Sequence, residues 1–261
     1  MAGVVEHTSM VWSALQEARF QKKSLVELWL DLANAYGSIP HALIKFALQR
    51  YGVSEVWIRL LMNYYDGLWT RVRTSSAQSN WKRLEKGIFA GCTVSVILFL
   101  AAFNILIEFV SAEKFPSFRL ANGNSLPLLR GFMDDLSVMT TGVPHARKIL
   151  ERVQVVLLWA RMKPKASKSR SCVIVKGRCM DVEPFEIGGE TIPSLQRKPL
   201  RTLGREYDAS LSDVNMRTHI VKQIKDGLRT IDKSSITGVM KLFTYQTRLY
   251  TSPNLLADND P

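Results

Sequence analysis

LVELWLDL (residues 25–32) and GFMDDLSV (residues 131–138) are the stretches that decide the fold of this chain. The first alternates along its length, which predicts a strand with one apolar face, a more polar second face and a carboxylate at its end. The apolar face comprises Val26, Leu28, Leu30 and Leu32, and the second face comprises Glu27, Trp29 and Asp31. The other stretch predicts two short apolar strands that meet at Asp134 and Asp135, because acidic residues between β-forming runs favour a tight turn.

The rest of the chain supplies helices and shorter strands around these two segments. Helical spacing and capping residues predict helices over residues 9–22, from Pro40 to Gly52, from Ser54 to Gly67, from about Thr93, and over residues 144–162. The sequence further predicts a polar hairpin over residues 69–86, a strand over residues 171–177, short strands over residues 184–204, and a basic helical segment over residues 211–246 with a frayed tail after it. Strands that alternate with helices and hairpins favour an α+β architecture, with one antiparallel sheet and helices on one side.

Composition limits the class of protein. Of 261 residues, 46% are hydrophobic and 22% are charged, which excludes a disordered chain, a collagen-like repeat and a disulfide scaffold. The net charge of +12 favours a polyanionic partner, which could be a nucleic acid, an acidic membrane surface or an acidic protein. Three cysteines without close pairing favour a reducing intracellular setting, and the four histidines lack zinc-ligand spacing.

An uncharged run over residues 87–107 is long enough to cross a membrane. Gly91, Cys92, Thr93, Ser95 and Asn104 interrupt its apolar character, and no second run of this kind follows. We therefore expect a buried helix in a globular core and no membrane partner, with a membrane anchor as the alternative.

Asp31, Asp134 and Asp135 are acids set in strongly apolar strands, where packing gives no reason for a charge. The doublet alone could be ordinary turn chemistry. If the two strands are neighbours, however, each pair of carboxylates at ~4 Å repels by about 4 kcal/mol at an effective dielectric constant of ~20. A divalent cation would relieve this repulsion, and oxygen ligands without His or Cys suit Mg²⁺.

Several segments together resemble the reverse transcriptases. They are LDLANAYGSIPH (30–41), GIFAGCTVSVILF (87–99), FMDDLSV (132–138), the region of Lys168 and Ser169, and TLG (202–204), in the family's order and spacing. The segment EHTSMVW (6–12) is similar to the one that precedes the first carboxylate in polymerases of non-long-terminal-repeat retrotransposons. The resemblance covers about residues 5–206.

The resemblance implies roles for individual residues. Asp31, Asp134 and Asp135 would be the catalytic residues and would hold two Mg²⁺ ions, for which Mn²⁺ could substitute. The nucleotide would contact Leu32, Ala35, Tyr36, Gly91 and Lys168, and primer and template would contact Phe132, Met133, Leu203 and Gly204. Tyr36 matches the family's aromatic gate, whose ring would clash with a ribose 2′-hydroxyl and so select DNA precursors.

Plainer interpretations of these residues stay open. Tyr36 could be a core tyrosine, Gly91 could simply begin a helix, and Lys168 could belong to a solvated basic face. Gly37 stands where many relatives have Asp, Ala90 replaces a frequent Gln, and Cys92 lies in a segment that is more polar in many relatives. These departures concern nucleotide handling and leave the three aspartates intact.

The resemblance implies a polymerase palm of α+β class, an antiparallel sheet backed by helices, with partial fingers and a partial helical thumb. Residues 1–24 would be the remnant of the fingers leading into the palm, residues 25–206 the palm, and residues 207–261 a partial thumb or connecting helical segment with a disordered tail. Few residues precede Asp31, so we expect a truncated fragment.

The implied function is RNA-directed DNA polymerase, acting on an RNA template, a DNA primer and deoxynucleoside triphosphates, together with other domains of the same polyprotein. The alternative is a catalytically inactive fragment that only binds nucleic acid. The expected location is intracellular, in the nucleus or the cytoplasm.

Overall fold

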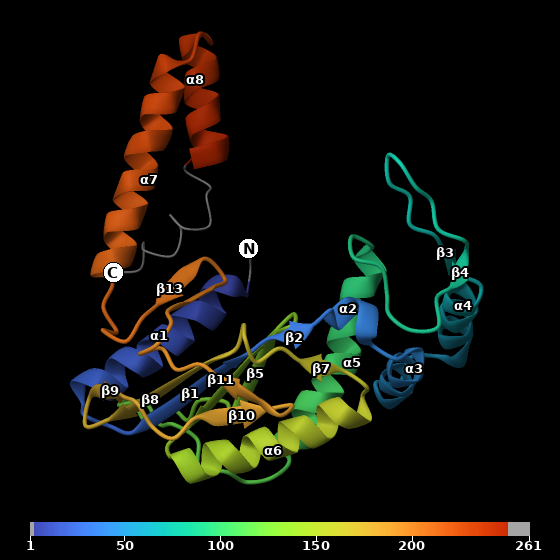
Figure 1. Cartoon of the computed structure of the whole chain (residues 1–261), viewed down its shortest axis with the longest axis horizontal. Coiled ribbons are helices and arrows are strands. Elements are labelled where there is room, and N and C mark those ends of the chain that lie inside the picture. The colour runs from blue at the N-terminus through green and yellow to red at the C-terminus, as the bar shows by residue number, and fades with distance from the viewer. Residues whose placement is uncertain (1–2, 250–261) are drawn as a thin grey trace.

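The computed structural model describes residues 3–249, and the tail predicted to be disordered lies almost wholly outside this range. Its centre is a five-stranded antiparallel sheet in the order β5-β6-β1-β8-β9 (Figure 1). The strands are β1 (Leu25–Leu30), β5 (Leu129–Phe132), β6 (Asp135–Thr140), β8 (Arg170–Val175) and β9 (Arg178–Met180). The predicted α+β class with an antiparallel sheet backed by helices is confirmed.

The middle strand β1 pairs with β6 on one side and β8 on the other. In this register Leu30 lies opposite Leu136, one residue from the doublet. Because β1 and β6 run antiparallel, the end of β1 and the beginning of β6 share one edge of the sheet. This pairing brings Asp31 to the turn that contains Asp134, although 103 residues separate them in the sequence.

One face of the sheet is covered by α5 (Thr93–Ser111) and α6 (Val143–Trp159). Helix α3 (His41–Arg50) packs on α5, and α4 (Glu55–Asp66) packs on α3. The larger hydrophobic core lies here, where Val26, Leu28 and Leu30 of β1 meet buried residues of these helices. The predicted starts of the helices near Pro40, Ser54 and Thr93 are confirmed within a residue.

Helix α5 contains most of the uncharged run. Of the helices within residues 3–249, it alone is long and apolar enough to cross a membrane. It packs instead against α3, α6 and β5, and Phe99, Ala102 and Phe103 are among its buried side chains. This is the core position that the sequence predicts for a buried helix.

The opposite face of the sheet is also covered, so the expectation of helices on one side is wrong. Helix α1 (Val4–Phe20) packs there, with Val11 and Leu15 against Trp29 of β1 in a second core. The hairpin of β12 (Leu200–Thr202) and β13 (Arg205–Tyr207) closes the same core with Leu200 and Tyr207. All six residues of β1 are consequently buried, including those predicted for a polar face.

Glu27 is the residue most affected by this second layer. It is fully buried in the middle of β1, where one carboxyl oxygen accepts a hydrogen bond of 2.6 Å from the Ser137 hydroxyl and the other has no partner. Burial raises the pKa of Glu27 well above its usual range. Burial therefore favours the protonated form of this side chain in the fold.

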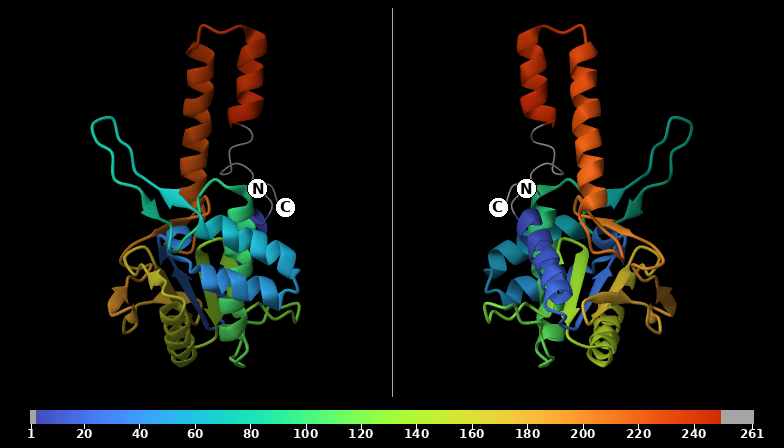
Figure 2. Two further views of the ribbon diagram at one scale, coloured as in Figure 1. Left: turned by 90° about the vertical axis from the view of Figure 1, so that its right-hand side faces the viewer. Right: turned by 90° about the vertical axis from the view of Figure 1, so that its left-hand side faces the viewer.

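Two arms rise from the body (Figures 1 and 2). One is the hairpin of β3 (Trp69–Thr70) and β4 (Lys82–Arg83), which confirms the predicted polar hairpin. The other is formed by α7 (Val214–Lys233) and α8 (Gly238–Thr244), followed by a short π-helical turn (Tyr245–Leu249). The basic helical segment predicted over residues 211–246 is thus helical for most of its length, and it consists of two helices because the chain reverses direction after α7. The small hairpin of β10 (Phe185–Ile187) and β11 (Glu190–Ile192) packs beside α6.

The buried acid makes a stability test possible. Glu27 ionises in the unfolded chain near pH 4.5 but not in the fold, so the wild-type protein loses stability as the pH rises above that value. The loss approaches about 1.4 kcal/mol per pH unit until the pKa of the folded state is reached. In urea unfolding, we expect Glu27→Gln to match the wild type near pH 4.5 and to become progressively more stable than it towards pH 8. Glu190→Gln, an exposed acid, is the control, and parallel pH profiles for Glu27→Gln and the wild type would contradict the prediction.

Candidate active site

The three aspartates lie together at one edge of the central sheet. Asp31 directly follows β1, Asp134 is in the two-residue turn between β5 and β6, and Asp135 begins β6. Burial raises the pKa of Asp31 and of Asp135, and the charge of Asp134 contributes to raising both values. The residues are therefore close enough to interact electrostatically. Even so, no three His, Cys, Asp or Glu side chains within residues 3–249 converge into a metal-binding cluster.

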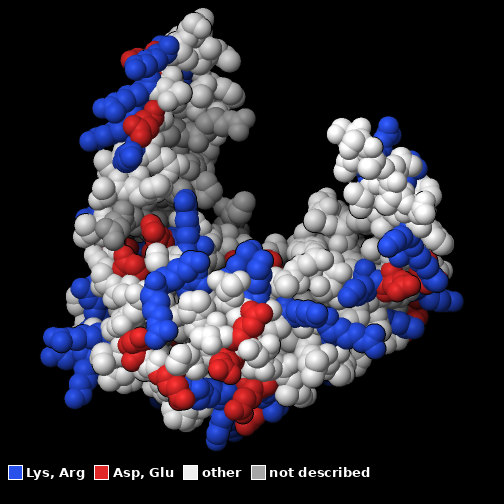
Figure 3. Space-filling model, in the orientation of Figure 1, with Lys and Arg blue, Asp and Glu red and all other residues white. Residues whose placement is uncertain are grey.

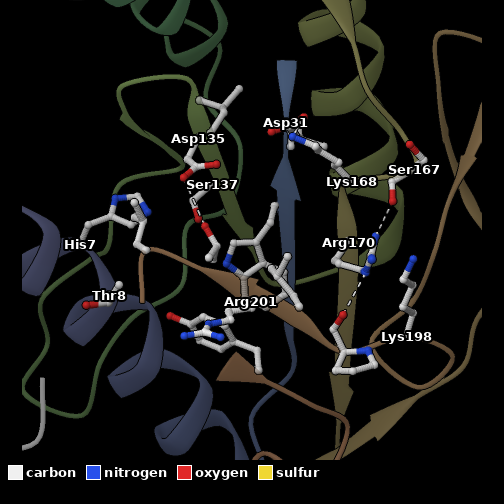
Figure 4. Close-up of a pocket in the computed structure, with 18 residues that line it drawn as sticks. His7, Thr8, Asp31, Asp135, Ser137, Ser167, Lys168, Arg170, Lys198 and Arg201 are labelled. Carbon is white, nitrogen blue, oxygen red and sulfur yellow. Dashed lines mark hydrogen bonds and ion pairs between the residues drawn. The ribbon is translucent and has the colours of Figure 1, made fainter. Parts of the chain in front are cut away.

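Asp31 is fixed by the basic loop that precedes β8. Its N–H donates a hydrogen bond of 3.1 Å to the Ser169 hydroxyl, and its carbonyl accepts one of 2.8 Å from the Lys165 N–H. The Lys168 ammonium lies 3.9 Å from Oδ2 of Asp31 (Figure 4). Nearby β2 (Leu32–Ala33) pairs with β7 (Lys163–Pro164), so both ends of this loop are attached to the segment around Asp31.

Asp135 is fixed from the other side of the site. Its Oδ2 accepts a hydrogen bond of 3.2 Å from the Thr202 hydroxyl on β12. This bond opposes the rise in the pKa of Asp135 that burial and Asp134 cause. It also connects the doublet hairpin with the β12–β13 hairpin, which lies against the same sheet.

The donor set suits a hard divalent cation. Oδ2 of Asp31 is buried and has no hydrogen-bond partner, and Lys168 is the cation paired with that carboxylate. Three carboxylates without His or Cys are the ligands that Mg²⁺ and Mn²⁺ prefer. Lys168 relieves part of their mutual repulsion, and a bound divalent cation would relieve the rest.

Tyr36, in the short helix α2 (Ala35–Ser38), packs in the core and also lies beside the doublet turn. Its ring stacks on Phe99 of α5, with 4.6 Å between the ring centroids and an interplanar angle of 11°. Its hydroxyl points to Met133 of the doublet turn, 3.8 Å from the sulfur. Packing in the core therefore holds the ring beside Asp134, whose charge adds to burial in raising the pKa of Tyr36.

The other residues predicted to contact the nucleotide differ in how accessible their side chains are. The side chains of Leu32 and Ala35 are buried in the larger core, so only their backbone could meet a ligand. Gly91 lies in the exposed loop before α5 with φ of +89°, a conformation that favours glycine. Lys168 is mostly exposed and stands at the carboxylates.

The four residues predicted for primer and template lie at the turns of two hairpins. Phe132 and Met133 are at the doublet turn, and Leu203 and Gly204 form the turn between β12 and β13. Met133 has φ of +54° and Leu203 φ of +49°, which are left-handed conformations that strain residues other than glycine. Such strain is concentrated at functional sites, where the surrounding structure maintains it.

The departure at Gly37 has a packing reason. A Cβ atom at this position would lie 2.4 Å from the Asn34 side chain. A Cβ at Gly87 would lie 2.7 Å from the Gly37 carbonyl oxygen, so the two glycines are in close backbone contact. The contact is reinforced where the Ile88 N–H donates to the Tyr36 carbonyl, which attaches the loop before α5 to the Tyr36 segment.

A cavity of about 470 Å³ opens beside the aspartates (Figure 4). Asp31, Asp135, Lys168 and Leu203 line it, as do six residues for which the sequence analysis predicted no role: His7, Thr8, Arg170, Lys198, Arg201 and Thr202. His7 is buried and its Nδ1 has no hydrogen-bond partner. Burial and the charge of Arg130 lower the pKa of His7 to about 4, so its ring is neutral near pH 7.

His7 and Thr8 carried a signal in the sequence through the EHTSMVW segment, and Thr202 carried one through the TLG segment. Arg170 could not be distinguished from its basic neighbours, yet it is buried and donates to the carbonyls of Ser167, Ser169 and Pro199. It thereby joins the Lys168 loop to the segment that leads into β12.

The bond between Thr202 and Asp135 can be tested without an activity assay. Thr202→Val removes the hydroxyl and keeps the shape, and we expect the free energy of unfolding near pH 7 to fall by about 1 kcal/mol. Thr202→Ser retains the donor and should unfold close to the wild type. The measurement is urea denaturation, and equal stability of Thr202→Val and wild type would show that this bond contributes nothing.

Comparison with known proteins agrees with this geometry. The family model described as Reverse transcriptase (RNA-dependent DNA polymerase) matches residues 2–207. The chain is 24% identical over 95% of its length to the Pol polyprotein of the type-2 retrotransposable element R2DM of Drosophila melanogaster, and 23% identical over 91% to that of the type-1 element R2 of Nasonia vitripennis. It spans about a quarter of these relatives, 23% and 24% of their lengths.

A solved structure of apo telomerase from Candida tropicalis, truncated from its C-terminal domain, has a similar fold. Its TM-score is 0.50 at 13% identity, over 78% of this chain and 38% of the telomerase chain. The relatives agree with the expected resemblance to polymerases of non-long-terminal-repeat retrotransposons. The aspartates at the sheet edge, the palm-like fold and the match over residues 2–207 together show that this chain belongs to the reverse transcriptase family.

Proposed function

We propose that this chain supplies the palm of an RNA-directed DNA polymerase. The observation that carries the proposal is that Asp31, Asp134 and Asp135 meet at one sheet edge with Lys168 beside them. Family membership makes the activity a nucleotidyl transfer, in which the primer 3′-hydroxyl attacks the α-phosphate of a deoxynucleoside triphosphate and pyrophosphate leaves. Within this proposal residues 25–206 are the palm, residues 1–24 lead into it, and residues 207–261 begin a thumb.

Asp31, Asp134 and Asp135 would hold two divalent cations, Mg²⁺ or Mn²⁺ in its place. When bound, such ions lower the pKa of an attacking hydroxyl and stabilise charge on the leaving oxygen. The chain itself contributes the fixed position of two of the carboxylates: Ser169 and Lys165 hold the Asp31 backbone, and Thr202 holds the Asp135 side chain.

Lys168 is the residue best placed to act on the triphosphate. Its side chain is 62% exposed and its contact with Asp31 is long, at 3.9 Å, so the ammonium is free to turn towards an anion in the cavity. There it would neutralise or protonate the departing pyrophosphate. Arg170 would keep the Lys168 loop in position from beneath.

Two hairpin turns would position the primer. Leu203 lines the cavity beside Asp135, and Phe132 and Met133 approach from the doublet. The bond between Thr202 and Asp135 joins these two turns, so the primer end and the carboxylates would be held as one unit.

RNA template, DNA primer and deoxynucleoside triphosphates are the proposed substrates, and other domains of a polyprotein are the proposed partners. The relatives being Pol polyproteins supports the last point. The net charge of +12 favours phosphate contacts and affinities that fall steeply with salt. An intracellular location, nuclear or cytoplasmic, is part of the proposal and is supported by the odd number of cysteines.

The doublet provides the decisive test. We expect Asp134→Asn to reduce Mg²⁺-dependent primer extension on an RNA template by about a hundredfold or more, because a metal ligand is lost. The same change should leave the metal-free protein at least as stable as the wild type, since it removes the charge that raises the pKa of Asp31 and Asp135. Extension is measured with labelled primer, and stability by urea unfolding.

Asp226→Asn, on the exposed face of α7, is the matched control and should change neither result. Undiminished extension by both Asp31→Asn and Asp134→Asn would overturn the assignment. Binding of primer and template without any incorporation by the wild type would instead identify a chain that binds nucleic acid and does not turn over.

From the position of Tyr36 we predict that the site selects deoxyribonucleotides over ribonucleotides. We expect Tyr36→Val to raise the incorporation of ribonucleotides relative to deoxynucleotides by about tenfold or more, because it removes the ring that a 2′-hydroxyl would meet. Tyr36→Phe keeps the ring and its stacking on Phe99, so it should retain the wild-type preference. Single-nucleotide extension with each triphosphate measures the ratio, and equal ratios for Tyr36→Val and Tyr36→Phe would exclude the gate.

A further inference from the structure

The hairpin of β3 and β4 carries two tryptophans and two arginines on one face, which we call the Trp/Arg face: Trp69, Arg71, Trp81 and Arg83. Trp69 and Arg83 are directly paired across the strands. Arg71 and Trp81 are each two residues further towards the turn, just beyond the ends of β3 and β4, and we infer from the strand alternation that they share this face. The Arg71 guanidinium lies 4.6 Å from the centroid of the Trp81 ring, which places these two side chains together.

This face is open to solvent. Trp69 and Trp81 are each 57% exposed, although the hairpin has no hydrophobic core of its own to account for them. Arg83 is held to the hairpin base by an ion pair with Asp66. Exposed aromatic rings beside fixed cations are a feature of binding surfaces.

The positive charge of the hairpin indicates a partner that carries negative charge. Residues 69–86 contain five Lys or Arg and a single acid, Glu85. In Figure 3 this arm faces the arm of α7 and α8 across the hollow above the body, and the Lys and Arg side chains seen on it lie at its tip and on its outer side. A polyanion with flat groups that stack on indole would satisfy both the cations and the aromatic rings.

We propose that the Trp/Arg face binds single-stranded RNA. Unpaired bases would stack on Trp69 and Trp81, and Arg71 and Arg83 would contact the phosphates that link those bases. A duplex offers no unstacked bases to the rings, and the carboxylates of an acidic peptide would pair with the arginines but supply no base to stack on the tryptophans. In the polymerase this strand would be the unpaired template, a role that rests on the proposed function, whereas RNA binding by the hairpin does not.

The experiment is fluorescence anisotropy of a labelled, unstructured RNA of about 12 nucleotides with the whole chain, without nucleotide or primer. We expect Trp81→Ala to weaken binding by about fivefold to a hundredfold, and Trp81→Phe to recover part of the loss. Trp159→Ala, which removes a tryptophan that is 64% exposed on α6, is the matched control and should leave binding unchanged.

The role of the arginines is tested by measuring how the RNA affinity depends on salt concentration. We expect Arg71→Gln to reduce the slope of log affinity against log salt by about 0.7, one phosphate contact on a single strand. Lys82→Gln removes a charge from the opposite face, where Lys82 pairs with Thr70, and should weaken binding less. Duplex RNA of the same sequence and single-stranded DNA are added as competitors. They show whether the face prefers single strands to duplexes and RNA to DNA.

Wild-type affinity in both Trp69→Ala and Trp81→Ala, with folding confirmed by circular dichroism, overturns the proposal. If those variants instead lose self-association in light scattering, the face is an interface between copies of the chain. A wild type that binds RNA through this face but fails to extend a primer would leave the proposal standing and refute the proposed polymerase activity.

Discussion

The hydrogen-bonded position of β1 between β6 and β8 is the constraint on which the rest of the structure depends. Among the described strands, β1 alone joins the two halves of the central sheet, and every one of its side chains is buried. Its antiparallel pairing with β6 delivers Asp31 to the doublet turn, and its pairing with β8 delivers the Lys168 loop to Asp31. The three aspartates and Lys168 therefore reach one edge of the sheet because of the register in which β1 pairs with its neighbours. A shift of that register by one residue would turn Asp31 to the other face of the sheet.

The gathering of like charges opposes the stability of that edge. Burial and mutual repulsion both raise the pKa of Asp31 and of Asp135, so the fold maintains carboxylates where they are unfavourable. The charges of Lys168 and Lys165 offset part of this effect at Asp31, and the hydrogen bond from the Thr202 hydroxyl offsets part of it at Asp135. Carboxylates that the fold gathers against their own repulsion have the character expected of the proposed cation site.

Neighbouring segments are connected to the site through backbone contacts. The close approach of Gly37 and Gly87 attaches the loop before α5 to Tyr36, and Arg170 attaches the Lys168 loop to the approach to β12. Left-handed residues at Met133 and Leu203 place both hairpin turns beside the same cavity. The two arms stand clear of this network (Figure 2).

Periodicity and motif spacing were sufficient to predict the antiparallel sheet, the main helices and the three aspartates, because these features depend on local pattern and on segments whose order is preserved along the chain. The second layer was not predictable: α1 and the β12–β13 hairpin cover the face on which Glu27 and Trp29 lie, and no local signal shows which faces will be covered. The same limit applies to the cavity. His7, Arg170 and Thr202 are far from Asp31 in sequence, and only tertiary packing, which buries side chains from separate elements against one another, decided that they share a site with it.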